Sequence, residues 1–422
     1  MASGKQERRQ IISWMLYDCA NSAFATTVLA GFFPVFFKKY WAGGMEVTRS
    51  SAVLGAAHSI ATLAVLLIAL LLGAYADRIA GRKKLLLVMC LGGSLSTCAL
   101  AFVNQGNHVL AIIVFIAAVT GFLGGNIFYD SLLPVVVPRE KQDIVSAGAF
   151  GLGYLGGGIL FLVNVTMYLK PGFWGLGDQA SAIRVSFFTV GLWWILFTVP
   201  LMLSVKEDRQ PAGNGSTGLL RESIRDTFSL FRKMRRNRNI FLFLLAFWLY
   251  NDAISTVIKM AVAYGSDVGI EQADMIKALL LVQFVGFPAA WIYGKITVKA
   301  GRKRMLLLSI GAYVFVVLYG ALMKSSGDFY ILAVVVALFQ GGIQAISRSM
   351  YASLIPAGQS AKFFGLYNVG AHFSTMLGPV LVGLTGHALK NPRAGLLVLE
   401  AFLVLGAIVL MKVKEEKKER HG

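Results

Sequence analysis

Charged residues are scarce in this sequence: Asp, Glu, Lys and Arg together make up only 14% of its 422 residues. Hydrophobic residues make up 56%, and the mean hydropathy is +0.67. A soluble domain of this length needs far less apolar material for its core, so the composition excludes an ordinary soluble protein. Most of the chain must therefore face lipid.

Cysteine is also rare, and the motifs of several enzyme classes are missing. The three cysteines, Cys19, Cys90 and Cys98, are odd in number and lack the spacing of a metal site. No G-x-x-x-x-G-K-[ST] loop occurs, which argues against ATP hydrolysis by this chain. The apolar segments show no nucleophile and base in a catalytic pattern. We therefore expect a protein that is not an enzyme and that holds no cofactor and no metal.

The long apolar runs predict membrane-spanning helices. A helix needs roughly 20 residues to cross about 30 Å of hydrocarbon. A membrane β-barrel would show alternating segments of about ten residues, which these continuous runs are not. We expect an all-α membrane protein with twelve transmembrane helices in two pseudo-symmetric six-helix bundles. The predicted spans are 12–37, 51–72, 85–103, 109–133, 145–169, 183–203, 240–265, 274–294, 304–323, 329–350, 361–385 and 394–411.

Two stretches of the chain resemble each other, which indicates an internal duplication. Trp14 and Asp18 near the start recur with the same spacing as Trp248 and Asp252. Duplicated helical halves are how many secondary transporters are built. Further matches follow in the same order, namely Gly81-Arg82-Lys83 with Gly301-Arg302-Lys303, 129–134 with 351–356, and 150–152 with 364–366.

One polar break divides the chain into these two halves. We expect an N-terminal six-helix bundle over 1–205, a cytoplasmic basic linker over 206–239, a C-terminal six-helix bundle over 240–411 and a charged cytoplasmic tail over 412–422. Within the linker, apolar residues recur at helical spacing among basic ones. This pattern predicts either a short basic amphipathic helix on the inner leaflet or a solvated helical linker. The apolar residues are Leu220, Ile224, Phe228, Phe231 and Met234.

The formal net charge of +19 comes from basic residues whose positions favour lipid over nucleic acid as the partner. Most of the Lys and Arg residues fall in the connections on one side of the predicted bundle, together with both termini. The positive-inside rule places that side in the cytoplasm. We therefore expect a multi-pass integral membrane protein with both termini cytoplasmic, in contact with anionic lipid headgroups and with no nucleic acid.

The connection after the second span carries a recognisable motif. Residues 73–84 read GAYADRIAGRKK, which resembles the loop 2-3 signature of the major facilitator superfamily, G-x-x-x-D-R-x-G-R-R/K, with one extra residue between Arg78 and Gly81. The copy at 294–304 keeps Gly301-Arg302-Lys303 but has Val298 where the acid would stand. Such a degenerate second copy is common in that superfamily.

Three further segments narrow the resemblance, which covers essentially the whole chain. Residues 14–24, 340–356 and 363–379 are similar to the branch that contains the vacuolar amino-acid effluxers of autophagy and their bacterial relatives. This resemblance implies a transporter without fixing its substrate, since the few eukaryotic members with an assigned substrate export neutral amino acids from vacuoles. A bacterial relative of this kind is expected in the inner (plasma) membrane. It also implies that the first and seventh helices line a central cavity.

Two carboxylates within predicted helices are candidate binding residues. An ionised carboxylate at membrane depth costs several kcal/mol unless it is paired, hydrated or protonated, so Asp18 and Asp252 should face a water-filled cavity or a partner. They are expected to accept a proton or hold a substrate amine, although interhelical packing remains the alternative. Lys259 lies two turns after Asp252 and either binds a substrate carboxylate or extends toward the headgroups.

Three further polar residues within the spans are candidates for binding. Arg348 and Asn126 occupy matching positions in the tenth and fourth spans, so the two halves present different chemistry at one depth. We interpret this difference as a source of selectivity or gating, with a purely structural arginine as the alternative. His372 is a candidate proton carrier or a packing histidine.

The loop 2-3 signature is a candidate gate. In the superfamily an acid near the cytoplasmic end of the fourth span, here Asp130, often completes the charge network of that loop. We therefore expect Asp130 to join Asp77, Arg78 and Arg82, and the network to hold the inner gate shut until the transporter faces inward. The small residues of the signature that belong to this gate are Gly73 and Gly81.

These observations favour a secondary active transporter that works by alternating access. The leading hypothesis is proton-coupled movement of a small polar metabolite, possibly a neutral amino acid, by a protein that functions as a monomer. One alternative is efflux of amphipathic drugs or siderophores, which the polar residues within the spans disfavour. Another is a non-transporting membrane receptor or scaffold, which the carboxylates kept in both halves disfavour.

Overall fold

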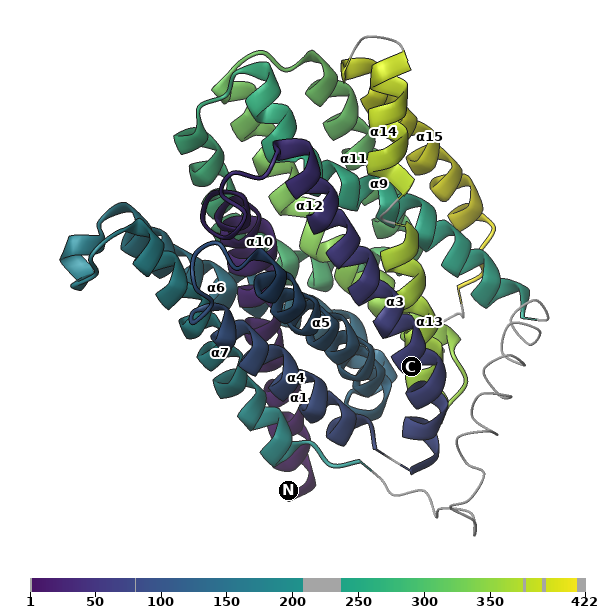
Figure 1. The fold of residues 1–422 in the computed structure, drawn as a ribbon. Coiled ribbons are helices and arrows are strands. Elements are labelled where there is room, and N and C mark those ends of the chain that lie inside the picture. The colour runs from purple at the N-terminus through teal and green to yellow at the C-terminus, as the bar shows by residue number, and fades with distance from the viewer. Residues whose placement is uncertain (1, 80, 208–236, 375–376, 389–391, 416–422) are drawn as a thin grey trace.

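The computed structural model describes residues 2–79, 81–207, 237–374, 377–388 and 392–415. Within these ranges the chain is helical and has no β-strand, and its helices run side by side as one bundle (Figure 1). Ten helices are long and apolar enough to cross a membrane, and the apolar helix Gly395–Met411 is shorter. With α13 and α14 they correspond to the twelve predicted spans, which confirms the expected fold class. The amphipathic helix predicted at 220–234 lies outside the described residues.

We refer to residues 2–207 as the first half and to residues 237–415 as the second half. The helices of the first half are α1 (Ala2–Ala23), η1 (Phe24–Phe32), α2 (Phe33–Phe36), η2 (Phe37–Trp41), α3 (Val47–Ile79), α4 (Arg82–Leu100), α5 (His108–Val136), η3 (Arg139–Lys141), α6 (Gln142–Leu169), η4 (Pro171–Trp174) and α7 (Gln179–Ser204). Those of the second half are α9 (Arg238–Val268), α10 (Gln272–Ala300), α11 (Arg302–Leu322), α12 (Ser326–Leu354), α13 (Ser360–Ser374), α14 (Leu377–Ala388) and α15 (Pro392–Met411).

The first span is one continuous helix with wide, π-helical turns in its C-terminal part. It runs from Gly4 to Trp41 and adopts π-helical geometry over Phe24–Phe32 and again over Phe37–Trp41. Single π-turns inside helices occur mostly at functional sites. The part beyond the π-segment is fixed by packing, because Phe33 stacks on Phe115 with ring centroids 3.7 Å apart.

Glycines bring neighbouring helices of the first half into close contact. A Cβ at Gly121 of α5 would lie 2.5 Å from the Cα of Gly93 in α4, so only glycine allows this approach. A Cβ at Gly157 of α6 would lie 3.0 Å from Ser22 in α1, and one at Gly153 would lie 3.4 Å from the Asp18 Cβ. These small residues therefore seat α1 on α6 and fix the position of Asp18.

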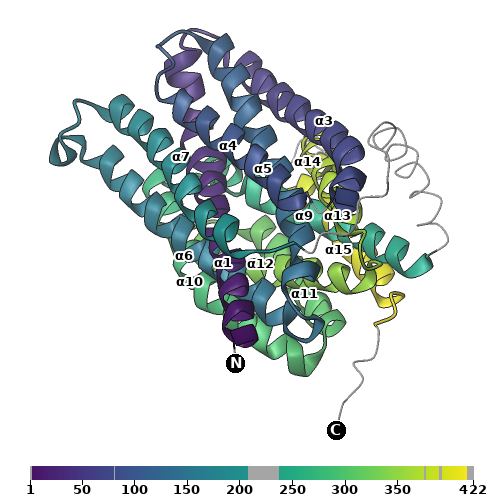
Figure 2. The same ribbon diagram turned by 90° about the horizontal axis from the view of Figure 1, so that it is seen from below.

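The two halves meet along two long seams. In one seam α10 packs against α6, and a Cβ at Gly151 would lie 3.0 Å from the carbonyl oxygen of Phe287. In the other seam α3 of the first half packs against α13 of the second, and Figure 2 shows these two helices next to each other. The central space between the halves is therefore enclosed by helices from both.

The eleventh predicted span, 361–385, is described in two parts, α13 up to Ser374 and α14 from Leu377, and residues 375 and 376 lie outside the described ranges. In α14 the N–H of Gly378 donates to the Asp252 carboxylate at 3.1 Å. This bond ties α14 to α9 within the second half.

Candidate functional site

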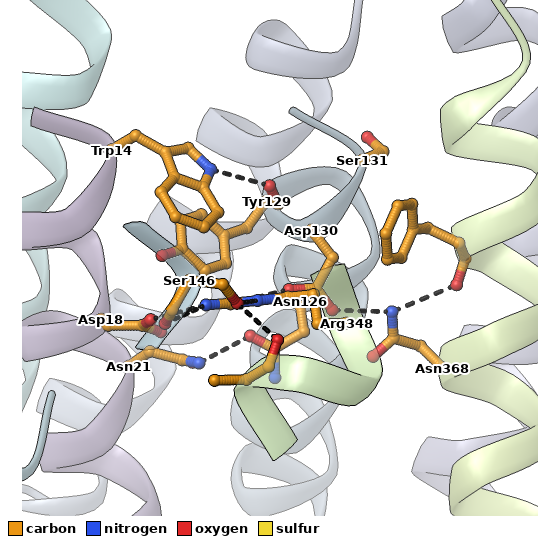
Figure 3. A network of polar contacts seen from close by, with 12 residues as sticks. Trp14, Asp18, Asn21, Asn126, Tyr129, Asp130, Ser131, Ser146, Arg348 and Asn368 are labelled. Carbon is orange, nitrogen blue, oxygen red and sulfur yellow. Dashed lines mark hydrogen bonds and ion pairs between the residues drawn. The ribbon is translucent and has the colours of Figure 1, made fainter. Parts of the chain in front are cut away.

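A buried cluster of opposite charges joins the two halves at the centre of the molecule (Figure 3). Arg348 of α12 is 3% exposed and donates to Asp130 of α5 at 3.1 Å and to Asp18 of α1 at 3.4 Å. It also donates to the hydroxyl of Ser146 at 2.9 Å and to its carbonyl oxygen at 3.2 Å. A guanidinium of the second half is thus bound by three helices of the first half.

Aromatic rings complete the surroundings of this guanidinium. Its central carbon lies 4.5 Å from the ring centroid of Phe150, 4.9 Å from that of Trp14 and 5.4 Å from that of Tyr129. The Trp14 ring is itself held in place because its N–H donates to the carbonyl oxygen of Tyr129. Cation–π contacts of this kind are strongest where water is excluded, so they add to the stabilisation from the two carboxylates.

The cluster forms part of the wall of a polar cavity of about 400 Å³ that lies between the halves. Asn126 of α5 accepts a hydrogen bond from Asn21 of α1 at 2.7 Å, and both side chains line the cavity. The wall is rich in carboxamides, and it includes helices from both halves. The polar and charged residues of the wall are Asp18, Asn21, Ser22, Thr26, Asn126, Tyr129, Asp130, Tyr154, Asn251, Ser255, Lys259, Gln283, Gln340, Gln344, Arg348, Tyr367, Asn368 and His372.

The cavity has one cationic side chain outside the Arg348 cluster among its described wall residues. This is Lys259, which extends from the same face of α9 as Asn251 and Ser255, at helical spacing. In the internal repeat Lys259 corresponds to Ala25, which follows Asp18 by seven residues, or about 10 Å along the first span. The cavity therefore separates a negative cluster at one level from a positive side chain further along.

Asp252 differs from the sequence-based expectation that both repeated acids share one aqueous cavity. Asp18 lines the central cavity, whereas Asp252 lines a separate pocket whose other described wall residues are apolar or glycine. The cause is the rotation of α9, which directs Asn251 and Ser255 inward and Trp248 and Asp252 to the other side. The repeat therefore preserves the residue type but not its surroundings.

The gate network predicted around the loop 2-3 signature is present in part. Asp77 accepts two hydrogen bonds from Arg82, at 3.0 and 2.7 Å. It also accepts from the backbone N–H groups of Ala361 and Lys362, each at 2.9 Å, at the start of α13. Burial raises the pKa of Asp77, while Arg82 and the two amides act against that rise. An acid of the first half thus caps a helix of the second, where the helix dipole favours negative charge.

Asp130 was expected in that network, and its described contacts lie elsewhere. Its carboxylate accepts from Arg348 and, at 3.0 Å, from the amide of Asn368, so it belongs to the central cluster. Of the other predicted gate residues, Gly73 lies against α13, where a Cβ would be 3.4 Å from Lys362. Gly81 precedes the first residue of α4, and the side chain of Arg78 lies outside the described part of the chain.

The second copy of the motif forms a contact that the sequence did not predict. Arg302 donates to Asp143 at 2.6 Å, and Asp143 also accepts from the hydroxyl of Ser349 at 2.8 Å. Asp143 lies in the first turn of α6, so the acid missing at Val298 is supplied by the other half. The sequence offered only a weak signal for Asp143, namely its position in a polar connection that faces the second copy of the motif.

Both contacts lie at one end of the bundle, which we call the basic end. It holds the start of α1 and the α3–α4, α5–α6, α10–α11 and α12–α13 connections, because successive spans alternate in direction. The halves are joined there by Asp77 with α13 and by Asp143 with Arg302. The structure is therefore of a state closed at the basic end. The described ranges contain no group of three or more His, Cys, Asp or Glu residues arranged to hold a metal ion.

Known proteins resemble this chain over almost all of its length. The family model described as "Vacuole effluxer Atg22 like" matches residues 6–422. The Bacillus subtilis protein "Uncharacterized MFS-type transporter YxiO" is 34% identical over 418 residues, which cover 98% of this chain and 96% of that protein. Autophagy-related protein 22 of Coccidioides immitis is 24% identical, over 89% of this chain and 74% of that protein. The human organic anion transporter MFSD10 has a similar fold, with a TM-score of 0.73 at 16% identity over 96% of this chain and 99% of that one.

Proposed function

The chain belongs to the family of Atg22-like vacuole effluxers and is a multi-pass membrane transporter of the major facilitator superfamily, and from this premise we propose that it moves a neutral amino acid by proton-coupled alternating access. Helical halves that rock about a central site are the usual means of such transport. The observation that carries the proposal is the polar cavity between the halves, whose wall holds charges of both signs.

The charges of the cavity suit a zwitterion. Asp18 and Asp130 together carry two negative charges when ionised, and Arg348 balances one of them. The remaining negative charge attracts a substrate ammonium, and Lys259 attracts a carboxylate from further along the cavity. The carboxamides supply hydrogen bonds without adding net charge.

The central cluster also provides a reason for proton coupling. When the halves separate at the basic end, Arg348 moves with the second half and leaves Asp18 and Asp130 in the first. Removing one partner from a buried ion pair costs about 3–5 kcal/mol, because the other charge stays buried. A proton or the substrate ammonium must then replace the guanidinium. Opening is thereby linked to the binding of positive charge.

Orientation, location and assembly follow as parts of the same proposal. The basic end faces the cytoplasm, both termini lie on that side, and the protein resides in a bacterial inner membrane with anionic lipids at its basic connections. We also propose that one chain suffices for function, since helices from both of its halves line the cavity. A tag at either terminus should then be accessible to protease only after the cells are opened.

Flux into liposomes tests the proposal. Purified protein should take up radiolabelled neutral amino acids, and an imposed pH gradient should accelerate the uptake. Asp18→Asn should abolish the effect of the gradient, whereas Asp252→Asn, which alters an acid outside the central cavity, should retain it. Uptake that ignores the gradient in both the wild type and Asp18→Asn would eliminate the coupling, and no uptake of any neutral amino acid would eliminate the substrate class.

A further inference from the structure

A second pocket lies on the flank of the bundle, apart from the central cavity. Its volume is about 570 Å³, which is within the range of small-molecule sites. It forms where α3 of the first half meets α9, α13, α14 and α15 of the second, and we call it the lateral pocket. Apart from Asp252, its walls are almost entirely hydrocarbon, with Leu66, Trp248, Leu249, Leu366, Leu377 and Phe402 among them.

The acid in this pocket is buried and only half satisfied. Asp252 is 2% exposed, and one of its oxygens accepts from the N–H of Gly378. Its other oxygen, Oδ2, has no hydrogen-bond partner among the described residues, and neither do the Thr256 hydroxyl and the Trp248 indole N–H. A buried carboxylate oxygen without a partner is costly, so this position calls for a positive or proton-bearing group.

Among the described residues, no basic side chain lines the pocket. The nearest basic residue along α9 is Lys259, two turns further on, and it lines the central cavity instead. A hard metal ion is a poor match, because such ions take six or more oxygen ligands and the pocket walls are apolar. A cation whose charge is attached to a large apolar group fits a single carboxylate between hydrocarbon walls.

We propose that the lateral pocket binds a lipophilic organic cation, with Asp252 as its counter-ion. The Trp248 ring offers a face for the same charge. Leu377 of α14, at the edge of the pocket, is 58% exposed, so the ligand enters from the bilayer beside the start of α14. This site is separate from the cavity of the transported zwitterion and does not depend on the identity of that substrate.

Ethidium is a suitable probe, since it is a permanent lipophilic cation whose fluorescence rises in apolar surroundings. Its titration into the full-length protein in lipid nanodiscs should give saturable binding above that of empty nanodiscs. Asp252→Asn, which keeps the shape and removes the charge, should weaken binding tenfold or more. The matched control is Glu400→Gln, which neutralises another acid of the second half outside the pocket and should leave the affinity within twofold.

A second variant covers the case in which Asp252→Asn does not fold. Leu377→Trp keeps the acid and places a larger ring at the exposed edge of the pocket, so it should also weaken ethidium binding. Binding that is unchanged in these variants, or equally weakened in Glu400→Gln, would overturn the proposal. The absence of saturable binding to the wild type would also overturn the proposal, and Asp252 would then be a protonated packing residue. Failure of amino-acid flux leaves the result of this titration unaffected.

Discussion

At the scale of the residue, the central site depends on Arg348. Its hydrogen bonds to Asp18, Asp130 and Ser146 all cross from the second half to the first. A buried ion pair contributes little net stability, but a lone buried charge is strongly destabilising. The arrangement therefore does more to specify one state of the transporter than to raise overall stability.

Removing the guanidinium tests this view. Arg348→Gln should lower the free energy of unfolding by about 3–5 kcal/mol, because Asp18 and Asp130 remain buried without their cation. Thermal unfolding of the purified protein should show a lower midpoint. Arg348→Gln combined with Asp130→Asn should recover part of the loss, since the two residues are in contact. Strictly additive losses would speak against the pairing.

The contact proposed for the substrate carboxylate is also a property of one residue. Lys259→Gln should raise KM for a neutral amino acid about tenfold or more, since a charge-assisted hydrogen bond is worth about 1.5–3 kcal/mol. Transport assays in liposomes provide the measurement. Lys324→Gln, in the exposed connection between α11 and α12, is the matched control and should leave KM unchanged. Equal KM values for all three proteins would remove Lys259 from the binding site.

The sequence indicated some of these residues because intramembrane charge is expensive, so Asp18 and Arg348 stand out in any apolar helix. It did not indicate that they meet, because they are 330 residues apart and pairing depends on how each helix is rotated. Helix rotation also explains Asp252. Its position in the repeat matches Asp18, but the rotation of α9 directs it into the separate apolar pocket. Asp143 was missed because an acid in the first turn of a helix is common.

At the scale of the element, two helix termini close the basic end. Asp77 caps α13 across the seam, and Asp143 in the first turn of α6 holds Arg302 at the start of α11. The motif repeat predicted that this end would carry a gate, which is a property of local sequence. The partners of each acid follow from how the halves pack, which local sequence does not encode.

Neutralising one cap should loosen the gate. In a protein without Cys19, Cys90 and Cys98, a cysteine at Ala352, which is 4% exposed, should react faster with a membrane-impermeant thiol reagent after Asp77→Asn. The control is Lys141→Gln, which breaks the exposed pair with Glu7 inside the first half and should change nothing. If both variants leave the labelling rate as in the parent protein, Asp77 does not hold the gate.

Close helix contacts within each half are equally testable. Gly121→Ala should lower the midpoint of thermal unfolding, because its Cβ would lie 2.5 Å from the backbone of Gly93. Gly311→Ala is the matched control, since its Cβ would meet nothing within 4 Å. It should be neutral or stabilising by roughly 0.5–1 kcal/mol, the usual preference for alanine in a helix. The same change in midpoint for both variants would contradict the glycine-dependent contact.

At the scale of the whole molecule, the two halves enclose one polar cavity and are locked together at one end. The cavity wall comes from both halves, and the lock comprises the Arg348 cluster and the two contacts of the basic end. Hydropathy predicted the twelve spans and the repeated motifs predicted the duplication, because both features depend on local sequence. The central claim is that loss of the Arg348 cluster lets the halves separate at the basic end.

The most direct test is a distance measurement between spin labels at Glu140, in the first half, and Ala357, in the second, both exposed at the basic end. The wild type at neutral pH should show mainly the short distance of the closed state. Arg348→Gln, or addition of a neutral amino acid with protons, should populate a longer distance. A single unchanged distance under all of these conditions would contradict the account.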